Sequence, residues 1–255
     1  GAMRAELLTI GSELTSGATV NTNAAELACC LARAGIVCQR QVAVGDERAA
    51  IERALQEALT RCNLLITTGG LGPTFDDLTM EAIAAVIGRP LVCIPTAAAR
   101  IRRFYRQAHR KLQQAALRQA FLPQGGQALA NPIGTAPGLW LALPAPIIVA
   151  LPGVPSEMRA ILERHVLPRL ARLPRREAIE TRLVRTIGIV ELEIQRLLRR
   201  IPTPQAVQVG LYPHLRAVDI RLTVQIPSRR RARDILNRLE AQLRRQLGAV
   251  VYGTD

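Results

Sequence analysis

The sequence predicts an α/β protein with a mostly parallel sheet and helices on both faces, followed by a small α+β domain. Over the first 170 residues, apolar runs of strand length alternate with segments of helical spacing. Such a βαβ series builds a parallel sheet that helices cover on both faces. After the proline-bounded stretch Pro168–Pro174 the order changes, and two strands follow one another directly. We therefore expect two domains, residues 3–170 and 175–255.

The first three strands are predicted by short β-prone runs, and the helices between them by their apolar faces. Ile51, Leu55 and Leu59 share one face of the second helix. Gly35 is expected to cap the first helix, since glycine is common just past a helix C-terminus. The expected strands are Glu6–Ile10, Ile36–Val44 and Leu64–Thr68, and the expected helices are Asn23–Ala34, Glu47–Arg61 and Asp77–Ile87.

The middle of the chain is less regular. Its composition predicts one helix over Thr96–Ala120 and then three short strands separated by glycine and proline. In the next helix, Ser156 is the expected N-cap, and Glu157 lies in the first turn, where the helix dipole favours a negative charge. The expected strands are Gln127–Ala130, Gly138–Leu143 and Ile147–Leu151, and the helix is Ser156–Leu170.

The last third predicts the small α+β domain. Its long final helix carries an apolar stripe with arginines on the other faces. The expected order is strand Arg182–Ile187, helix Glu191–Ile201, strands Val207–Leu211 and Val218–Gln225, helix Ser228–Leu247 and a short strand Val250–Tyr252.

Composition excludes several classes of protein. Of the 255 residues, 49% are hydrophobic and 21% charged, which is typical of a globular chain and not of a disordered one. The longest apolar stretch, Leu139–Leu151, is interrupted by prolines and is shorter than the roughly 20 residues of a membrane span, so we expect no membrane association. Five cysteines without a CxxC pair predict reduced, mostly buried thiols in a cytoplasmic protein.

The net charge of +14 is unevenly distributed. Residues 1–170 carry 17 basic and 12 acidic residues, whereas residues 171–255 carry 17 and 8, so a polyanion partner has to be considered for the last third. No glycines there form a GXXG loop, and Tyr212 and Tyr252 are its only aromatic residues. The arginines of the final helix flank its apolar stripe, as on a solvated face, so we expect no specific nucleic-acid binding.

Three polar loops follow the first three strands, where ligands bind in parallel sheets. The first, Gly11–Asn23, contains Glu13 and Asn21, and the second places Asp46 directly after a strand. In the third, Thr67–Thr79, glycines allow backbone N–H groups to approach an anion, and carboxylates follow beside it. The third loop contains Gly69, Gly70, Gly72, Thr74, Asp76 and Asp77. This pattern fits a divalent cation of the magnesium type bridging protein and phosphates.

Simpler interpretations exist for each motif taken alone. A glycine-rich turn between strand and helix is often only a tight turn, and Asp46 or Asp76 alone is a candidate helix cap. The coincidence of three polar loops after three strands favours function. The chain has no Walker A lysine motif, no GxSxG and no HExxH, which disfavours those enzyme classes.

Five ordered motifs carry a resemblance to a known family. The motifs are GSELTSGATVNTN at Gly11–Asn23, VGDE at Val44–Glu47, TTGGLGPTFDDLT at Thr67–Thr79, NPIGTAPG at Asn131–Gly138 and LPGVPSEM at Leu151–Met158. Through them the sequence resembles the N-terminal part of the CinA (competence/damage-inducible protein A) family, which has a MoaB/MogA-like molybdopterin-binding fold. Through VGLY at Val209–Tyr212 and the final GAVVYGTD, the end of the chain resembles the small KH-like CinA domain.

The resemblance implies an activity at a phosphoanhydride next to adenosine. CinA proteins of this type are associated with metal-dependent cleavage of ADP-ribose to AMP and ribose 5-phosphate, and MogA-type proteins adenylylate molybdopterin. The two acidic positions of the MogA-like pattern match Asp46 and Asp77. The resemblance also implies a homo-oligomer. Because the chain ends before the amidase domain of long CinA proteins, we do not expect amidase activity.

Three hypotheses follow. In the first, the protein is a nucleotide pyrophosphatase that needs a divalent cation but no organic cofactor, with Asp46, Asp76 and Asp77 as metal ligands. Asp46 and Asp77 are also its expected catalytic residues. In the second, it binds molybdopterin or adenylated molybdopterin, and in the third it binds a polyanion. The expected nucleotide contacts are Gly11, Glu13, Asn21, Gly69, Gly70, Gly72, Thr74, Asn131, Gly134, Thr135, Gly153, Ser156 and Glu157.

One departure from the family pattern is visible. The family usually reads roughly NNRKQA in the segment that here reads AALRQA, so Ala115 and Ala116 replace two asparagines. If those asparagines contact substrate in the family, activity or specificity differs in this chain.

Overall fold

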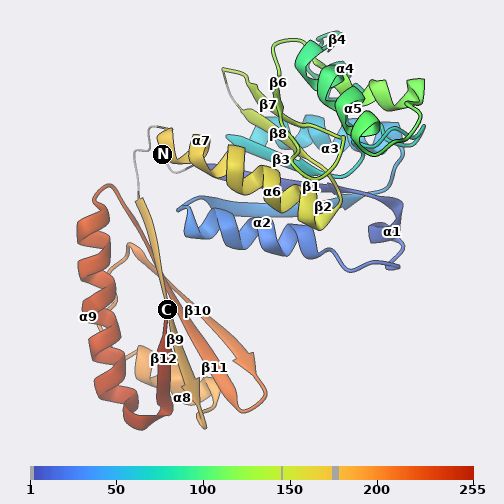
Figure 1. Ribbon diagram of the computed structural model, residues 1–255. Helices are drawn as coiled ribbons and strands as arrows, with labels where there is room; N and C mark the ends of the chain where they lie inside the picture. Colours follow the sequence, from blue (N-terminus) through green and yellow to red (C-terminus); the bar gives the residue numbers. More distant parts are fainter. Residues whose placement is uncertain (1–2, 145, 174–177) are drawn as a thin grey trace. The chain divides into compact units, whose positions relative to one another are not determined.

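The computed structural model describes residues 3–144, 146–173 and 178–255. The chain divides into two compact units, Met3–Leu173 and a second unit from Pro174 to Asp255. Figure 1 shows the first unit in blue to yellow and the second in orange to red. Each unit has its own sheet and its own buried core.

The first unit is built on a six-stranded sheet with the strand order β2-β1-β3-β8-β7-β6. The neighbours β2, β1, β3 and β8 run parallel, while β7 and β6 add two antiparallel pairings. The predicted mostly parallel sheet is therefore confirmed. The strands are β1 (Arg4–Ile10), β2 (Val37–Val44), β3 (Leu64–Thr68), β6 (Gln127–Leu129), β7 (Gly138–Ala142) and β8 (Ile147–Leu151).

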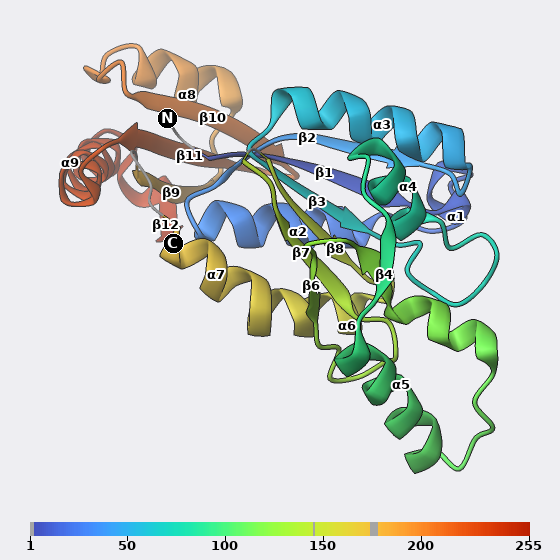
Figure 2. The same ribbon diagram turned by 90° about the horizontal axis from the view of Figure 1, so that it is seen from above.

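Helices cover both faces of this sheet. Figure 2 shows α3 on one side and α2, α6 and α7 on the other. A π-helical segment, η2, joins α6 to α7 without a break. The helices are α1 (Ser12–Thr15), α2 (Thr22–Arg33), α3 (Arg48–Arg61), α4 (Thr79–Val86), α5 (Pro95–Gln107), the 3-10 helix η1 (Gln114–Ala120), α6 (Pro155–Ile161), η2 (Leu162–Val166) and α7 (Leu167–Arg172).

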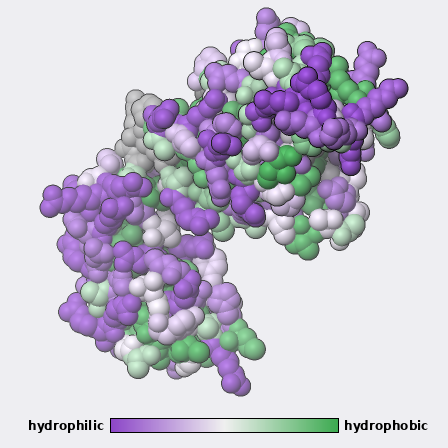
Figure 3. Space-filling view, viewed as in Figure 1, coloured by the Kyte–Doolittle hydropathy of each residue, from purple (hydrophilic) through white to green (hydrophobic). Residues whose placement is uncertain are grey.

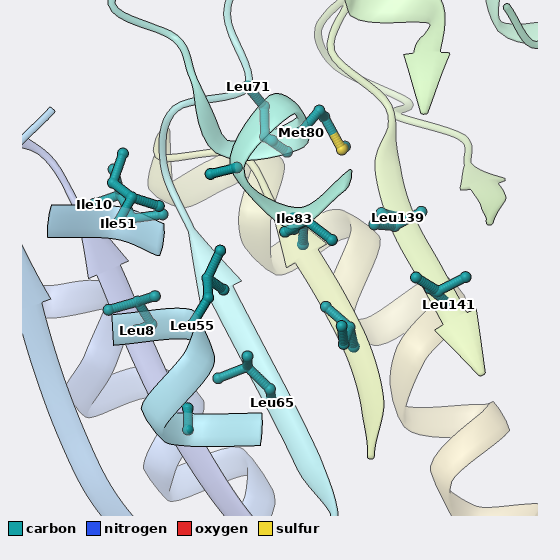
Figure 4. Close-up of a cluster of buried hydrophobic side chains, with 14 of the residues drawn as sticks. Leu8, Ile10, Ile51, Leu55, Leu65, Leu71, Met80, Ile83, Leu139 and Leu141 are labelled. Atoms are coloured by element: carbon teal, nitrogen blue, oxygen red, sulfur yellow. The ribbon is translucent and has the colours of Figure 1, made fainter. Parts of the chain in front are cut away.

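Alternation along the strands divides the core into two layers. Leu8 and Ile10 of β1 face α3 and α4, whereas Ala5 and Leu7 face α2 and α6, because successive strand residues point to opposite faces. Figure 4 shows the layer under α3 and α4. The residues labelled there are Leu8, Ile10, Ile51, Leu55, Leu65, Leu71, Met80, Ile83, Leu139 and Leu141. Strands apolar on both faces are the expected consequence of a sheet buried between helices.

One carboxylate lies within this core. Glu6 of β1 is 2% exposed and shares the face of Leu8 and Ile10. The guanidinium of Arg61, in the last turn of α3, donates two hydrogen bonds to its carboxylate, Nε to Oε1 and Nη2 to Oε2, both at 3.0 Å. The ion pair therefore joins the central strand to the helix that covers it.

The prediction of a single helix over Thr96–Ala120 is wrong. Helix α5 ends at Gln107, where His109 adopts a left-handed φ of +50°. His109 N donates to Arg106 O and Arg110 N to Tyr105 O, the paired bonds of a Schellman ending. The chain re-enters helical geometry only in η1. Two three-residue strands, β4 (Leu91–Cys93) and β5 (Phe121–Pro123), flank this region and pair with one another.

A smaller expectation about α6 is also wrong. Ser156 is not an N-cap, because the helix begins one residue earlier, with Pro155 in its first turn and Val154 as the cap residue. Helix α7 continues across Pro168 to Arg172, and the two units divide between Leu173 and Pro174, within the predicted boundary stretch Pro168–Pro174.

The cysteines are all free, but they are not mostly buried as predicted. Cys29 and Cys93 are exposed, and only Cys62 is buried. Burial raises the pKa of the Cys62 thiol to about 11. The residue thus behaves as part of the core and not as a reactive thiol.

The second unit is the small α+β fold that the sequence predicts. Its sheet has the order β10-β11-β9-β12 and is antiparallel throughout. Both helices pack on one face, and Ser228 caps the longer one by accepting from Arg231 N. The elements are β9 (Ala178–Ile187), α8 (Glu191–Leu198), β10 (Val207–His214), β11 (Ala217–Ile226), α9 (Arg229–Leu247), the 3-10 helix η3 (Gly248–Val250) and β12 (Val251–Thr254).

Across residues 3–144, 146–173 and 178–255, no helix has both the length and the apolar character that crossing a membrane requires.

Candidate functional site

The register of the sheet brings the predicted loops to one edge. Ile10 of β1 lies beside Val44 of β2, Thr9 beside Thr68 of β3, and Thr68 beside Leu151 of β8. All four parallel strands therefore end at the same level, and their carboxyl-terminal loops leave from one edge. β7 begins at this edge as well, since its Leu139 pairs with Ala150 of β8. This is the edge at which open α/β sheets bind ligands.

The turn after β3 depends on two glycines. Gly69 has a φ of +101°, and a β-carbon there would lie 2.1 Å from the backbone oxygen of Ile10. Gly70 has a φ of +67°, and its β-carbon would meet Thr79 Oγ1 at 2.2 Å. Thr79, at the start of α4, donates from Oγ1 to Gly69 O and from its backbone N to Gly70 O. The turn is thus held against both β1 and the N-terminus of α4.

The amide of Gly69 already has a partner. Gly69 N donates to Leu151 O at 3.0 Å, which ties the turn to the end of β8. Gly153 lies against the same residue, since its β-carbon would be 3.3 Å from Gly69 Cα. If this turn binds an anion, the donors are therefore the backbone N–H groups that follow Gly69.

Thr74, Asp76 and Asp77 form one cluster on this loop. Thr74 Oγ1 lies 2.5 Å from Asp76 Oδ1 and also contacts Asp77 Oδ2, which in addition accepts from Thr74 N at 2.8 Å. A hydroxyl has one proton, so it can donate to only one of the two carboxylates. The Asp77 carboxylate also covers Gly72, whose β-carbon would lie 2.4 Å from Oδ2. Two negative charges thus sit together beside the glycine-rich turn.

The segment that departs from the family pattern contacts this loop. Arg118 donates to Thr74 O and to the carboxylate of Glu81, and Gln119 Nε2 donates to Leu71 O. Ala116 is buried against α5. The contacts to the glycine-rich loop therefore come from Arg118 and Gln119, which the sequence analysis did not select.

The loops after β1 and β2 are bonded to each other. Asp46 Oδ2 accepts from Ser12 N at 2.8 Å, and Ser12 Oγ accepts from Asp46 N at 3.1 Å. Asp46 is therefore not the cap of α3 but holds the start of the short helix α1. Glu13 folds back over Gly11, where a β-carbon would be 2.4 Å from Glu13 Oε1.

Two asparagines connect α2 to the strand ends. Asn21 caps α2 by accepting from Ala24 N and donates to Thr9 Oγ1 at 2.8 Å. Asn23, which the sequence analysis did not select, donates to Thr68 Oγ1 and to Gly153 O. Its Oδ1 is buried without a hydrogen-bond partner among the described residues. Asn23 lies within the first motif. The signal that could have selected it is its position on the buried face of α2, with Leu27 and Leu31.

The loop between β6 and β7 is shaped by Asn131. This side chain is 4% exposed and accepts from Ile133 N and Gly134 N, while its amide donates to Ala136 O and to Glu157 Oε2 at 2.6 Å. Glu157 lies in the first turn of α6, after β8, and covers Gly134 as closely as Glu13 covers Gly11. These contacts bring Asn131, Gly134 and Glu157 together at the same edge.

The remaining predicted residues lie at the periphery. Thr135 lines a cavity beneath α5, and Ser156 is exposed on the first turn of α6. Exposed apolar side chains come from the loops around the edge: Val20, Phe75, Ile133 and Val154.

The acidic residues do not form a complete metal cage. Within the described part of the chain, no group of three or more His, Cys, Asp or Glu side chains could hold a metal ion. Asp76 and Asp77 offer hard oxygen ligands side by side, with the Thr74 hydroxyl between them. This donor set fits magnesium held by one or two carboxylates with substrate phosphates supplying further ligands. Asp46 is instead engaged with Ser12.

Comparison with known protein families follows the same division of the chain. Residues 6–172 match the family model described as "Probable molybdopterin binding domain". Residues 181–253 match the one described as "Damage-inducible protein CinA KH domain". The chain belongs to the CinA family.

Other CinA proteins resemble nearly the whole chain. A CinA-like protein from Salinibacter ruber is 40% identical over 254 residues, covering 99% of this chain and 62% of the relative. One from Parasynechococcus marenigrum is 40% identical over 251 residues, covering 98% and 60%. The chain thus spans about three fifths of the length of these relatives. The crystal structure of CinA from Thermoplasma acidophilum, described as a protein of unknown function, is 39% identical with a TM-score of 0.60, over 64% of this chain and 95% of that one.

Proposed function

We propose that the first unit is a metal-dependent pyrophosphatase that cleaves ADP-ribose to AMP and ribose 5-phosphate. The observation that carries this proposal is the Thr74–Asp76–Asp77 cluster beside the glycine-rich turn, at the edge where α/β sheets bind ligands. Both reactions that the family resemblance implies act at a phosphoanhydride next to adenosine. A site that combines backbone N–H groups with adjacent carboxylates suits that bond.

In this proposal each loop has a separate task. The N–H groups after Gly69 and the N-terminus of α4 receive phosphate oxygens. Asp76 and Asp77 hold a divalent cation, which when bound neutralises the charge that the phosphates develop. Asp46, held by Ser12, stands ready to orient the attacking water. The loops of Asn21, Asn131 and Gly153 enclose the nucleotide, with Gly11, Glu13, Gly134, Thr135, Ser156 and Glu157 as further contacts.

The decisive variant is Asp77→Asn. It preserves the size of the side chain and an acceptor for Thr74 N but removes the charge. We expect turnover of ADP-ribose with Mg²⁺ to fall by about 10²-fold or more, as for other groups that stabilise a transition state electrostatically. The melting temperature should stay nearly unchanged.

Glu47→Gln is the matched control, because it removes the same charge from an exposed residue that makes no cap bond. Its turnover should remain within about threefold of wild type. ADP-ribose cleavage by Asp77→Asn at the wild-type rate would refute the assignment. Calorimetry should also show Mg²⁺ binding more tightly in the presence of nucleotide, and a stoichiometric zinc that survives chelation would contradict this metal site.

A second candidate function is binding of molybdopterin or its adenylated form. The family model that covers residues 6–172 favours it. A thermal-shift comparison of ADP-ribose, ATP and molybdopterin, each with and without Mg²⁺, separates the two. Stabilisation by molybdopterin alone, without metal dependence, would support the second function over the first.

A further inference from the structure

A cavity of about 260 Å³ lies between helix α5 and the loop that links β6 to β7. Its walls include Thr96, Arg100, Arg103 and Phe104 from the helix and Asn131 and Thr135 from the loop. Thr96, Arg100, Arg103 and Gln107 all line it, and their spacing of three and four residues places them on one face of α5. The cavity is therefore a feature of one helix face and one ordered loop.

The chain segment that carries α5 is strongly basic. Between Glu81 and Glu157 the chain contains no acidic residue. The same segment contains eight basic residues: Arg89, Arg100, Arg102, Arg103, Arg106, Arg110, Lys111 and Arg118. Figure 3 shows hydrophilic side chains gathered over the α5 region of the first unit. None of the cavity's lining residues is a carboxylate, but Glu157 lies behind the loop wall, where it accepts a hydrogen bond from Asn131 and covers Gly134. The arginines of α5 lie on the opposite wall.

Two arginines differ in how they are engaged. Arg100 Nη2 donates to Asn131 O at 3.0 Å, which fixes its guanidinium at the cavity wall. The guanidinium of Arg103 has no hydrogen bond or ion pair with any described residue, although it lines the same cavity. The N-terminal turn of α5 also borders the space through Thr96 and Ala97, and a helix N-terminus favours negative charge. The cavity wall therefore offers an anion the guanidinium of Arg100 in a fixed position, the guanidinium of Arg103, unpaired among the described residues, and the N-terminus of α5.

From this arrangement we infer that the cavity binds a phosphate group, with Arg103 as its principal ligand and Arg100 as a fixed second one. Arginine forks match the paired oxygens of phosphate, and such charge-assisted hydrogen bonds are the strong ones. Phe104 and Thr135 provide an apolar and a polar wall for whatever carries the phosphate. The inference rests on the proposed function only in naming the carrier, a sugar phosphate of the kind that ADP-ribose cleavage releases.

The test uses calorimetry on the full chain at about 150 mM salt, with ribose 5-phosphate, inorganic phosphate and uncharged ribose as probes. We expect both phosphates to bind and ribose not to bind. Arg103→Gln should weaken ribose 5-phosphate binding by about tenfold or more, the range for one lost charge-assisted hydrogen bond. Arg102→Gln is the matched control, because it removes the same charge from the same helix at a residue outside the cavity. It should change binding by less than about threefold.

Two results would overturn the inference: equal losses in the Arg102 and Arg103 variants, which would indicate a diffuse charge effect, or equal binding of ribose and ribose 5-phosphate. A further titration distinguishes a phosphate group of the nucleotide substrate from a separate anion. ADP-ribose binding is measured in EDTA, where metal-dependent cleavage is blocked, with and without saturating inorganic phosphate. Competition assigns the cavity to the nucleotide substrate, and its absence assigns it to a separate anion; either outcome is compatible with a phosphate site. Failure of ADP-ribose cleavage would remove the proposed function but leave these binding results standing.

Discussion

At the residue scale, Gly69 shows how strictly the candidate site constrains its backbone. Its positive φ would strain any other residue, and a β-carbon would also collide with Ile10 O at 2.1 Å. We expect Gly69→Ala to lower the free energy of unfolding by about 3 kcal/mol or more. Gly88→Ala is the control, since Gly88 has a φ of +65° but nothing within 4 Å of an added carbon. It should cost only the roughly 1–2 kcal/mol of a left-handed residue. Equal losses in urea unfolding would contradict the close packing of Gly69.

His165 offers a second test at this scale, through pH. Burial lowers the pKa of His165, against the opposing effect of its hydrogen bond to Ala130 O and with the help of nearby arginines. A folded-state pKa below the unfolded value means that its contribution to stability is present above about pH 6.5 and is lost as the pH falls through the folded-state value. We expect His165→Gln to flatten part of the decline in unfolding free energy between pH 7.5 and 5.5.

The same measurement on His109→Gln is the control, because His109 is exposed and lies in the turn after α5. It shows what the same substitution does at a histidine outside the buried site, and the change in slope should be specific to the His165 variant. A His165 variant with the wild-type slope would show that this ring does not titrate differently in the folded state.

What the sequence could predict for single residues depended on backbone signals. Backbone positions that need a positive φ, such as Gly69 and Gly70, can be recognised in the sequence because they favour glycine over other residues. The roles of Asn23 and Gln119 cannot be recognised in this way, because they depend on hydrogen bonds from the side-chain amides to a strand or loop far away in the sequence. Ser156 was misassigned for a related reason: a proline one position earlier began the helix first.

At the element scale, the attachment of α3 to β1 relies on the buried Glu6–Arg61 pair. Arg61→Gln leaves a nearly buried carboxylate without its partner, which is the costly way to break such a pair. Because Arg61 itself is 31% exposed, water reduces the loss, and we expect a measurable destabilisation that is smaller than for a fully buried pair. Arg53→Gln, on an exposed position of the same helix, should change stability by less than about 0.5 kcal/mol.

The double variant Glu6→Gln/Arg61→Gln provides the internal check. Removing both charges should recover part of the loss, because the uncompensated carboxylate is gone. Strict additivity of the two single substitutions in denaturant unfolding would show that the ion pair contributes nothing to joining β1 to α3.

Elements were predicted well where long-range packing and local pattern agree. The strands Leu64–Thr68 and Ile147–Leu151 match β3 and β8 to the residue, since both are continuous apolar runs bounded by turn residues. The α5–η1 region was not, because helical composition continues past Gln107 while the chain turns at His109. Among the described residues, β4 and β5 pair only with each other in a two-stranded sheet and are three residues long, too short for any periodicity to show.

At the scale of the whole molecule, the second unit carries the larger excess of positive charge. Several of its arginines nevertheless form ion pairs with acidic residues of the same unit. Arg229 and Arg233 both pair with Glu180, and Arg182 and Arg244 both pair with Glu240. We therefore expect the full chain to bind oligonucleotides only nonspecifically, with an affinity that falls steeply between about 50 and 200 mM salt. Fluorescence anisotropy measures this directly. A preference for one oligonucleotide over scrambled controls that persists at about 150 mM salt would contradict the prediction.

The order of the whole fold was accessible from sequence because alternating elements allow few arrangements. The alternation predicted a parallel sheet, and the edge at which its loops meet followed from that. The arginine cavity was not accessible, since it depends on how α5 packs over the loop of Asn131. A homo-oligomer, a divalent cation and a cytoplasmic location remain predictions.

The position of β3 beside β8 has a consequence for synthesis on the ribosome. Leu64 pairs with Ile147, roughly 80 residues later in the chain. At a translation rate of about 5–20 residues per second, β8 is synthesised on the order of 4–16 s after β3. One edge of β3 remains unpaired during that time. During that interval β1 and β2 can already pair with the emerging sheet, but Gly69 has no Leu151 to bond and Asn23 has no Gly153. The candidate site is thus assembled only after the last strand of its sheet has left the exit tunnel, and a nascent chain stalled before residue 147 would expose β3 as an open edge to chaperones and to other chains.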